Sequence, residues 1–250
     1  MRDGPSMSDA EPVHLVVARC NGYAIVTLDR PAKRNALTFA MRWGVATALT
    51  NLAGEDEIAC VVLTGAAPDF CAGMDVTRFG GDDANRREIV DSTTALFAAL
   101  ATFPKPLVAA VEGRALGGGL ALLLACDIRI AGRGAVFGMP EVKFGAAGGF
   151  AVLRAAVGDG PARELALTAR SFDADEAHRL GLLAEIVGAG AALARAEVVA
   201  AELALLPRRG LLLQTDIIRA TAGRPLAEGL AYEHDVFCRA VLRPDSSPRR

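Results

Sequence analysis

A cluster of glycines lies where the chain could bind an anion. The segment Gly113-Arg-Ala-Leu-Gly-Gly-Gly-Leu120 stands between a strand-like run, residues 107–111, and an apolar helix-like run, residues 120–125. Glycines let a ligand approach the backbone, and the free N–H groups at a helix N-terminus favour negative charge. Close packing of a helix on a strand would explain the same glycines. The segment lacks the Lys-Ser/Thr ending of a P-loop, so a nucleotide phosphate is the weaker interpretation of the anion.

A loop of small residues follows another predicted strand and the Thr64-Gly65 turn. Its sequence is Asp69-Phe-Cys-Ala-Gly-Met-Asp75. Open α/β sheets bind ligands at the carboxyl ends of their strands, where such a loop lies. The same residues could form an ordinary capped turn, and the loop by itself favours that interpretation.

One acidic residue stands in an otherwise apolar stretch, Phe137-Gly-Met-Pro-Glu-Val-Lys-Phe-Gly145. If Glu141 is partly buried, its pKa is raised and its carboxylate is suited to proton transfer. The alternative is a solvent-facing glutamate that begins a helix, where the helix dipole favours an acidic side chain. The residues alone leave both interpretations open.

Alternating strands and helices must position these three segments. A hairpin is predicted first, from the runs 14–18 and 23–28 joined by Asn21-Gly22. Apolar runs then predict strands at 58–63, 107–111 and 127–130, and helical spacing predicts helices at 38–53, 85–103 and 120–125. From residue 148 the pattern is mostly helical, with segments at 150–157, 161–169 and 173–180 and two longer ones from residue 191. This order predicts an α/β core with a helical appendage.

Composition excludes several classes of protein. Hydrophobic residues make up 52% of the chain and charged residues 22%, which predicts one main folded domain. The net charge of -2 and the dispersed arginines argue against nucleic-acid binding. The cysteines form no C-x-x-C pair and the histidines have no metal-ligand spacing, so we expect a reduced, cytoplasmic protein without a metal. Residues 1–12 are polar and no apolar run could span a bilayer, so we expect no membrane partner.

Taken together, the motifs resemble the crotonase family, also called the enoyl-CoA hydratase/isomerase superfamily. The likeness follows the chain in order through residues 28–37, 64–65, 70–75, 115–119, 126–129, 137–141 and 180–182. It implies a crotonase-like spiral of ββα repeats over residues 13–190, after a flexible N-terminal tail of residues 1–12. It also implies a helical C-terminal region, residues 191–250, through which relatives assemble as trimers or pairs of trimers.

The resemblance implies a site for an acyl-coenzyme A thioester. Its oxyanion hole would be the backbone N–H groups of Met74 and Gly118, and preformed donors stabilise an enolate-like oxyanion without reorganisation. The residues implied to bind the acyl-CoA are Lys33, Arg34, Asn35, Ala36, Ala72, Gly73, Asp75 and Gly117. A solvated loop remains an alternative for Lys33 and Arg34. Coenzyme A arrives as part of the substrate, so no dissociable cofactor is expected.

The chain departs from the family pattern at one catalytic position. A typical hydratase of the family has two glutamates; the second matches Glu141, but Ala121 stands where the first would be. Hydration uses two carboxylates conveniently, whereas a single base suffices for moving a proton between two carbons in an isomerisation. Lyase-type relatives also use the later glutamate alone. The sequence therefore leaves hydration and isomerisation open, with a non-catalytic acyl-CoA binder as the alternative from another class. The stretch after Glu141 is also a few residues shorter than in relatives, which could widen the acyl pocket.

Overall fold

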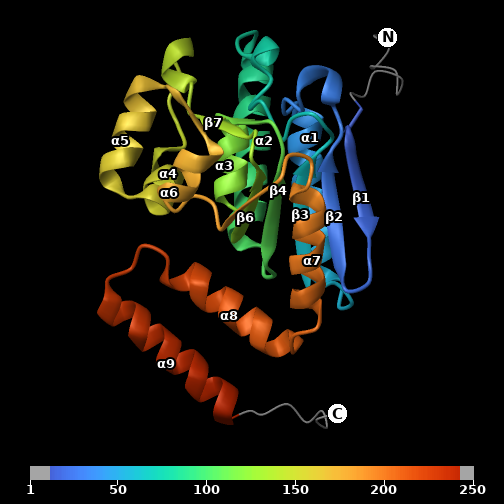
Figure 1. Ribbon diagram of the computed structural model, residues 1–250, viewed down its shortest axis with the longest axis vertical. Helices are drawn as coiled ribbons and strands as arrows, with labels where there is room; N and C mark the ends of the chain where they lie inside the picture. Colours follow the sequence, from blue (N-terminus) through green and yellow to red (C-terminus); the bar gives the residue numbers. More distant parts are fainter. Residues whose placement is uncertain (1–11, 243–250) are drawn as a thin grey trace, which may run out of the picture.

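Apolar strands build the central sheet of the molecule (Figure 1), a computed structural model that describes residues 12–242. Within these residues the strand order is β1-β2-β3-β4-β6-β9. Strand β1 pairs antiparallel with β2, and the remaining neighbours pair parallel. Their bounds are Leu15–Arg19, Tyr23–Leu28, Cys60–Gly65, Leu107–Val111, Ile128–Gly132 and Glu185–Val187.

Both faces of the central strands β3 and β4 are buried, as is usual for parallel strands. On one face Val61 and Leu63 of β3 join the core beneath the helices α1 (Phe39–Gly54) and α2 (Asp83–Thr102). On the other face Cys60 and Val62 pack with alanines 192, 196 and 200 of α7 (Ala192–Ala204). The continuously apolar run of β3 therefore contributes side chains to two hydrophobic cores, one on each face of the sheet.

A smaller sheet carries the segments that the sequence singled out. Strands β5 (Arg114–Leu116) and β7 (Val136–Gly138) pair parallel, and β8 (Ser171–Asp173) pairs antiparallel with β7. Leu116 lies opposite Gly138, so the chain leaves both strands at the same end of the sheet. The glycine cluster follows β5 and enters α3 (Gly118–Leu124), and Glu141 follows β7. The pairing of two short strands thus places the glycines beside Glu141.

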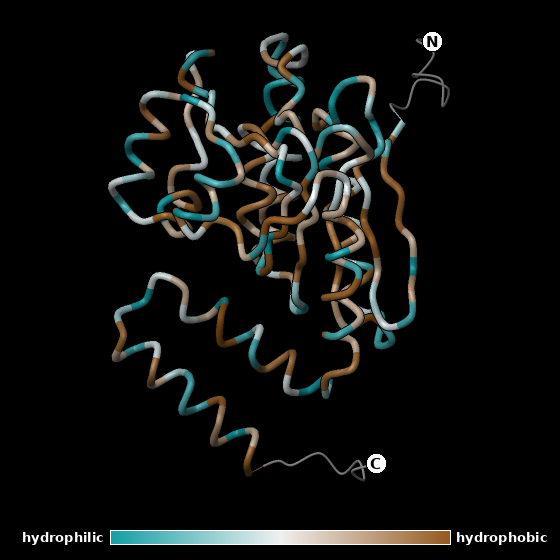
Figure 2. Tube along the Cα trace, in the orientation of Figure 1, coloured by the Kyte–Doolittle hydropathy of each residue, from teal (hydrophilic) through white to brown (hydrophobic). Residues whose placement is uncertain are grey.

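The helical C-terminal third has two parts. Helices α4 (Phe150–Val157), α5 (Asp159–Thr168) and α6 (Ala174–Arg179) lie beside the smaller sheet, and α7 covers the central sheet. Helices α8 (Arg208–Thr221) and α9 (Leu226–Leu242) run antiparallel and extend away from the core (Figure 1). In Figure 2 hydrophobic and hydrophilic residues alternate along both of them. In the described part of the chain, no helix combines the length and apolarity needed to cross a membrane.

The predicted strands and helices of the core are present, but the three-residue strands were not predicted. Thr38 and Asp173 are residue types that begin helices, and each does so here. The Thr38 side chain caps α1 by accepting a hydrogen bond from the Met41 N–H, and Asp173 caps α6 in the same way with the Glu176 N–H.

Two predictions need correction. An Asn-Gly hairpin turn of the expected kind takes a positive φ at both residues, but here Gly22 has one, of 84°, and Asn21 does not. Within the described residues, three helices rather than two follow residue 191. Strands β5, β7, β8 and β9 have three residues each, too few to show a period. The predicted tail, residues 1–12, falls almost wholly outside the described residues.

Asn35 joins the loops that follow β2 and β3. Its side chain is completely buried, and its Nδ2 donates hydrogen bonds to the carbonyl oxygens of Ala66 (2.8 Å) and Asp69 (2.6 Å). Its Oδ1 accepts a hydrogen bond from the Arg30 N–H at 2.8 Å. Buried polar groups are costly unless paired, so this side chain holds the two loops in one arrangement.

Replacing Asn35 with alanine is expected to lower the free energy of unfolding by about 2–4 kcal/mol, because it leaves buried backbone groups unpaired. Urea denaturation measures the change. Asn51→Ala on the exposed surface of α1 is a matched control, and its effect should stay within about 0.5 kcal/mol. Equal effects for the two variants would contradict the joining role.

Candidate active site

A pocket of about 330 Å³ lies where the loop after β3, the start of α3 and the turn after β7 meet. Several of the predicted site residues line it together. They are Ala72, Gly73, Met74, Gly117, Gly118 and Glu141. The three segments that the sequence analysis treated separately therefore form one site.

The backbone N–H of Met74 is directed away from the neighbouring loop. Leu37 donates its N–H to the Gly73 carbonyl at 2.8 Å and accepts a hydrogen bond from the Asp75 N–H at 3.1 Å. Successive backbone groups of an extended segment point to opposite sides. The Met74 N–H, between these two bonds, therefore points away from Leu37, and no described residue accepts a hydrogen bond from it.

Gly118 supplies a second donor on the same wall. It is the first residue of α3, so its N–H has no acceptor within the helix. A Cβ atom placed on Gly73 would lie 3.5 Å from the Gly118 nitrogen, which shows how close the two backbone segments are. Gly117, the residue before Gly118, has a φ of 52°. Its own N–H donates a 2.8 Å hydrogen bond to the Gly138 carbonyl. Met74 and Gly118 thus both line the pocket, and no described residue accepts a hydrogen bond from the backbone N–H of either one.

Glu141 stands beside these donors as a half-buried carboxylate. It begins the 3-10 turn Glu141–Phe144, and a Cβ atom placed on Gly117 would lie 2.8 Å from its Oε1. Its Oε2 is buried and has no hydrogen-bond partner among the described residues. Burial raises the pKa of the Glu141 carboxyl, and a hydrogen bond from its own backbone offsets this only in part. This environment suits a group that takes up and returns a proton.

Ala121, which stands where the family resemblance implies a first glutamate, is buried. Ala121 lies one turn after Gly117 in α3, with its N–H bonded to the Gly117 carbonyl, and it is 7% exposed. Among the described residues that line the pocket, Glu141 is the one with a carboxylate.

The loop of residues 33–36, which the resemblance implies to lie along coenzyme A, has both exposed and buried positions. Lys33 and Arg34 are exposed and Ala36 is half-buried. The Ala72 N–H donates to the Arg34 carbonyl at 2.9 Å, so this loop adjoins the pocket. The Asn35 side chain is turned into the protein, where it joins loops as described above.

Asp75 likewise points into the protein. Its carboxylate forms an ion pair with Arg30 at 2.7 Å and accepts hydrogen bonds from the N–H and hydroxyl of Thr77. Burial alone would raise the pKa of the Asp75 carboxyl, but the bonds from Thr77 and Arg30 outweigh it and hold the pKa below its usual value. Arg30, which the sequence analysis did not single out, also donates to the Ala36 carbonyl at 3.2 Å. The Arg30–Asp75 ion pair therefore joins the loop that follows β2 to the loop that follows β3.

The apolar walls of the pocket were not predicted from the sequence. Val76, Phe79 and Phe144 line it and are each more than half exposed, and Ala146 completes the wall. Phe79 and Phe144, each followed by a glycine in a loop, were the signal in the sequence for an apolar wall. Whether these side chains point into the pocket depends on how the loops fold. No described group of His, Cys, Asp and Glu residues could hold a metal ion.

Comparison with known proteins identifies the relatives of this chain. A model of the enoyl-CoA hydratase/isomerase family matches residues 18–246. A probable enoyl-CoA hydratase of Mycobacterium tuberculosis is 35% identical over 240 residues, which cover 93% of this chain and 91% of that protein. The 2,3-dehydroadipyl-CoA hydratase of Escherichia coli is 34% identical over 226 residues, with 89% and 88% covered. The crystal structure of an enoyl-CoA hydratase from Bacillus anthracis has a TM-score of 0.87 at 30% identity, covering 93% of this chain and 92% of its own. The predicted crotonase-like α/β spiral with a helical C-terminal region is confirmed, and the chain belongs to the enoyl-CoA hydratase/isomerase family.

Proposed function

We propose that this pocket binds an acyl-CoA thioester and stabilises its enolate. The N–H groups of Met74 and Gly118 donate to the thioester oxygen, and Glu141 moves a proton at the adjacent carbon. The coenzyme A portion leaves the pocket along the exposed loop of Lys33 and Arg34. Membership of the family and the meeting of these groups in one pocket support this assignment.

The oxyanion hole supplies much of the rate enhancement. Removal of a proton beside the thioester places negative charge on the carbonyl oxygen, and donors aimed at that position need not reorganise. A single donor of this kind is worth about 3 kcal/mol of barrier. Since both donors belong to the backbone, they persist whatever side chain stands at position 74.

The reaction that this site favours is double-bond isomerisation of a 3-enoyl-CoA. The ionised Glu141 takes a proton from the α carbon, which forms a dienolate whose oxygen is held by Met74 and Gly118. The protonated Glu141 then returns that proton to the γ carbon, and a conjugated 2-enoyl-CoA results. No water or redox partner is consumed. The single carboxylate among the described residues that line the pocket carries this choice.

Hydration of a 2-enoyl-CoA is the second candidate, because relatives at 34–35% identity are named hydratases. In that reaction Glu141 would have to serve both the attacking water and the α carbon. A non-catalytic binder is disfavoured, since a buried, unpaired carboxylate oxygen costs stability that simple binding does not require.

Glu141→Gln is expected to lower turnover by about 10²- to 10⁴-fold, because the amide cannot accept the proton. Turnover is followed by the absorbance of the conjugated thioester, which appears from a 3-enoyl-CoA on isomerisation and disappears from crotonyl-CoA on hydration. In the wild type kcat/KM should be full above the raised pKa of Glu141 and fall as the pH drops through it, with a midpoint above the ordinary value of about 4.3.

Glu57→Gln, at an exposed position, is the control for this variant and should retain the full rate. An undiminished rate in Glu141→Gln would remove Glu141 from its role. Binding of both acyl-CoAs by the wild type without turnover of either would favour the non-catalytic binder instead.

Ala121→Glu tests whether the second carboxylate decides the reaction. Side chains four residues apart lie on one face of a helix, so a carboxylate at position 121 lies one turn from Gly117. We expect the ratio of crotonyl-CoA hydration to 3-enoyl-CoA isomerisation to rise by about tenfold or more, within the range of one acid–base group. Ala121→Gln is the isosteric control without the charge. An unchanged ratio in a folded Ala121→Glu protein would show that the carboxylate is not limiting.

We further propose that the protein assembles as a homotrimer or a pair of trimers through residues 191–250. Helices α8 and α9 leave large apolar side chains exposed, which is unusual for an isolated monomer. They include Ile218, Leu226, Leu230, Phe237, Val241 and Leu242.

Leu230→Glu combined with Phe237→Glu should reduce the molar mass in solution, because charges at a buried interface are strongly unfavourable. Light scattering after size exclusion gives the mass. The control is Val90→Glu, an exposed apolar position on α2. A double variant that keeps the wild-type mass would place the interface elsewhere.

A further inference from the structure

The residue after Met74 belongs to an ion pair that the proposed chemistry does not use. The Nη1 of Arg30 donates to the Asp75 Oδ2 at 2.7 Å and to the Ala36 carbonyl at 3.2 Å. The Arg30 and Asp75 side chains are only 18% and 9% exposed. Water and salt therefore screen this pair less than a pair on the surface, and its geometry is held more firmly.

The two bonds of Arg30 lie on either side of the backbone segment that carries an oxyanion donor. Leu37 and Met74 pair as a parallel β-bridge. The Ala36 carbonyl lies one residue before Leu37, and the Asp75 carboxylate lies one residue after Met74. Arg30 thus holds both strands of the bridge, so a rotation of the Met74 peptide would disturb its contacts.

The Asp75 carboxylate also begins the next turn of the chain. It accepts hydrogen bonds from the N–H and the hydroxyl of Thr77 and so caps the 3-10 turn Val76–Arg78. Val76 and Phe79, on either side of this cap, line the thioester pocket. One carboxylate therefore fixes a backbone donor and the apolar wall that follows it.

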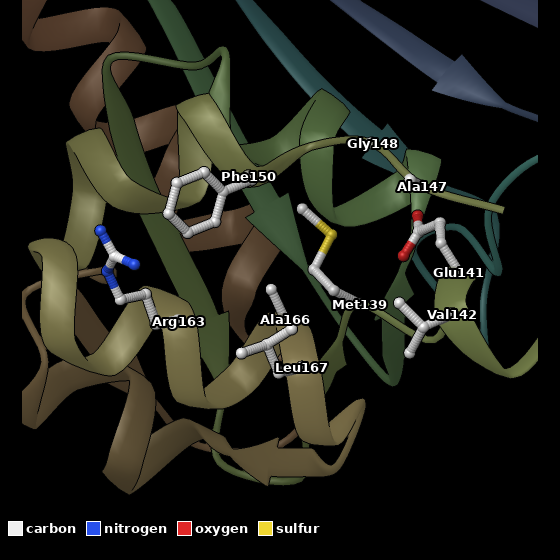
Figure 3. A pocket seen from close by; sticks show the side chains of 9 residues that line it. All are labelled: Met139, Glu141, Val142, Ala147, Gly148, Phe150, Arg163, Ala166 and Leu167. Carbon is white, nitrogen blue, oxygen red and sulfur yellow. The ribbon is translucent and has the colours of Figure 1, made fainter.

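Arg30 also neutralises a negative charge beside the oxyanion hole. Asp75 is ionised at neutral pH, and among the described side chains the cation that contacts it is Arg30. No described residue that lines the thioester pocket is a cation. The nearest pocket-lining cation in Figure 3, Arg163, lies far from the Glu141 carboxylate and pairs with Asp159. Without Arg30, an unpaired anion would oppose negative charge on the thioester oxygen.

We infer that Arg30 is a positioning residue of the oxyanion hole, which acts through Asp75 to hold the Met74 N–H in place and to cancel the charge beside it. The inference rests on the proposed function and deepens it. Neither Arg30 nor Asp75 lines the pocket, so neither side chain touches the reacting atoms. Because the thioester oxygen is charged only in the enolate, the effect of Arg30 falls on the enolate far more than on the bound substrate.

Arg30→Met keeps the length of the side chain but removes its charge and both hydrogen bonds. For the enoyl-CoA that the wild type turns over, kcat should fall by about 10- to 100-fold, part of the value of a whole donor. The Kd of saturated butyryl-CoA should change by less than about threefold, because the lost interaction belongs to the enolate. The matched control is Arg195→Met, which removes an ion pair with Glu185 outside the pocket and should keep both values.

A second measurement on the full-length protein needs no turnover. Acetoacetyl-CoA ionises to an enolate that absorbs in the ultraviolet, and donors on its thioester oxygen lower its pKa. In Arg30→Met the pKa of the bound compound should rise by about one unit or more, which is tenfold in enolate stability. Adding Asp75→Asn to Arg30→Met removes the unpaired charge and should reverse part of this rise. Arg30→Lys keeps the charge and should show a smaller rise; both variants serve if urea denaturation shows that Arg30→Met is unfolded.

The outcomes separate the inference from the proposed function. Equal losses in kcat and in affinity for butyryl-CoA would assign Arg30 a purely structural role and overturn the inference. An unchanged kcat and an unchanged enolate pKa in the folded variants would overturn it too and leave the function standing. A wild type that lowers the pKa of acetoacetyl-CoA through Arg30 but turns over neither enoyl-CoA supports the inference and overturns the function.

Discussion

The site depends on two stretches of backbone that approach more closely than side chains allow. A Cβ atom on Gly119 would overlap the Cys71 carbonyl, and one on Gly73 would lie 2.8 Å from the Leu116 carbonyl oxygen. Hydrogen bonds fix this approach, with the Leu116 N–H donating to the Cys71 carbonyl at 3.0 Å. Because the main chains touch, two unpaired N–H groups from distant parts of the sequence reach one wall of a pocket. The fold around them serves largely to hold these two peptides in place.

Much of this arrangement could be predicted from the sequence, because long elements and glycine clusters leave local patterns. The helix caps at Thr38 and Asp173 follow from neighbouring residues alone. The pairing of β5 with β7, which brings Glu141 to Gly117, joins residues far apart in the chain through strands too short to show a period. The sequence of a polar loop also does not show in which direction the side chains of Asn35 and Asp75 point. Whether such side chains face solvent or the interior depends on the loops packed against them.

Glu141 illustrates the tension between function and stability. Its pKa is raised by burial, so the folded protein binds this proton more tightly than the unfolded chain does. The penalty for burying the ionised form is absent below the ordinary glutamate pKa and is fully present above the raised value. At neutral pH the protein thus carries a cost at the residue that the proposed chemistry requires. Such costs are common at active sites, where local rules of stability are broken.

The position of Glu141 on the wall of the pocket that it lines with Met74 and Gly118 has a thermodynamic consequence. An apolar group that enters this pocket removes water from the carboxylate, and this raises the pKa of Glu141 further. Linkage is reciprocal, so the protonated protein must hold that group more tightly than the ionised protein by the same factor. Occupancy of the apolar space and uptake of a proton are therefore a single coupled equilibrium. A lower pH favours retention of an apolar occupant, and a higher pH favours its release.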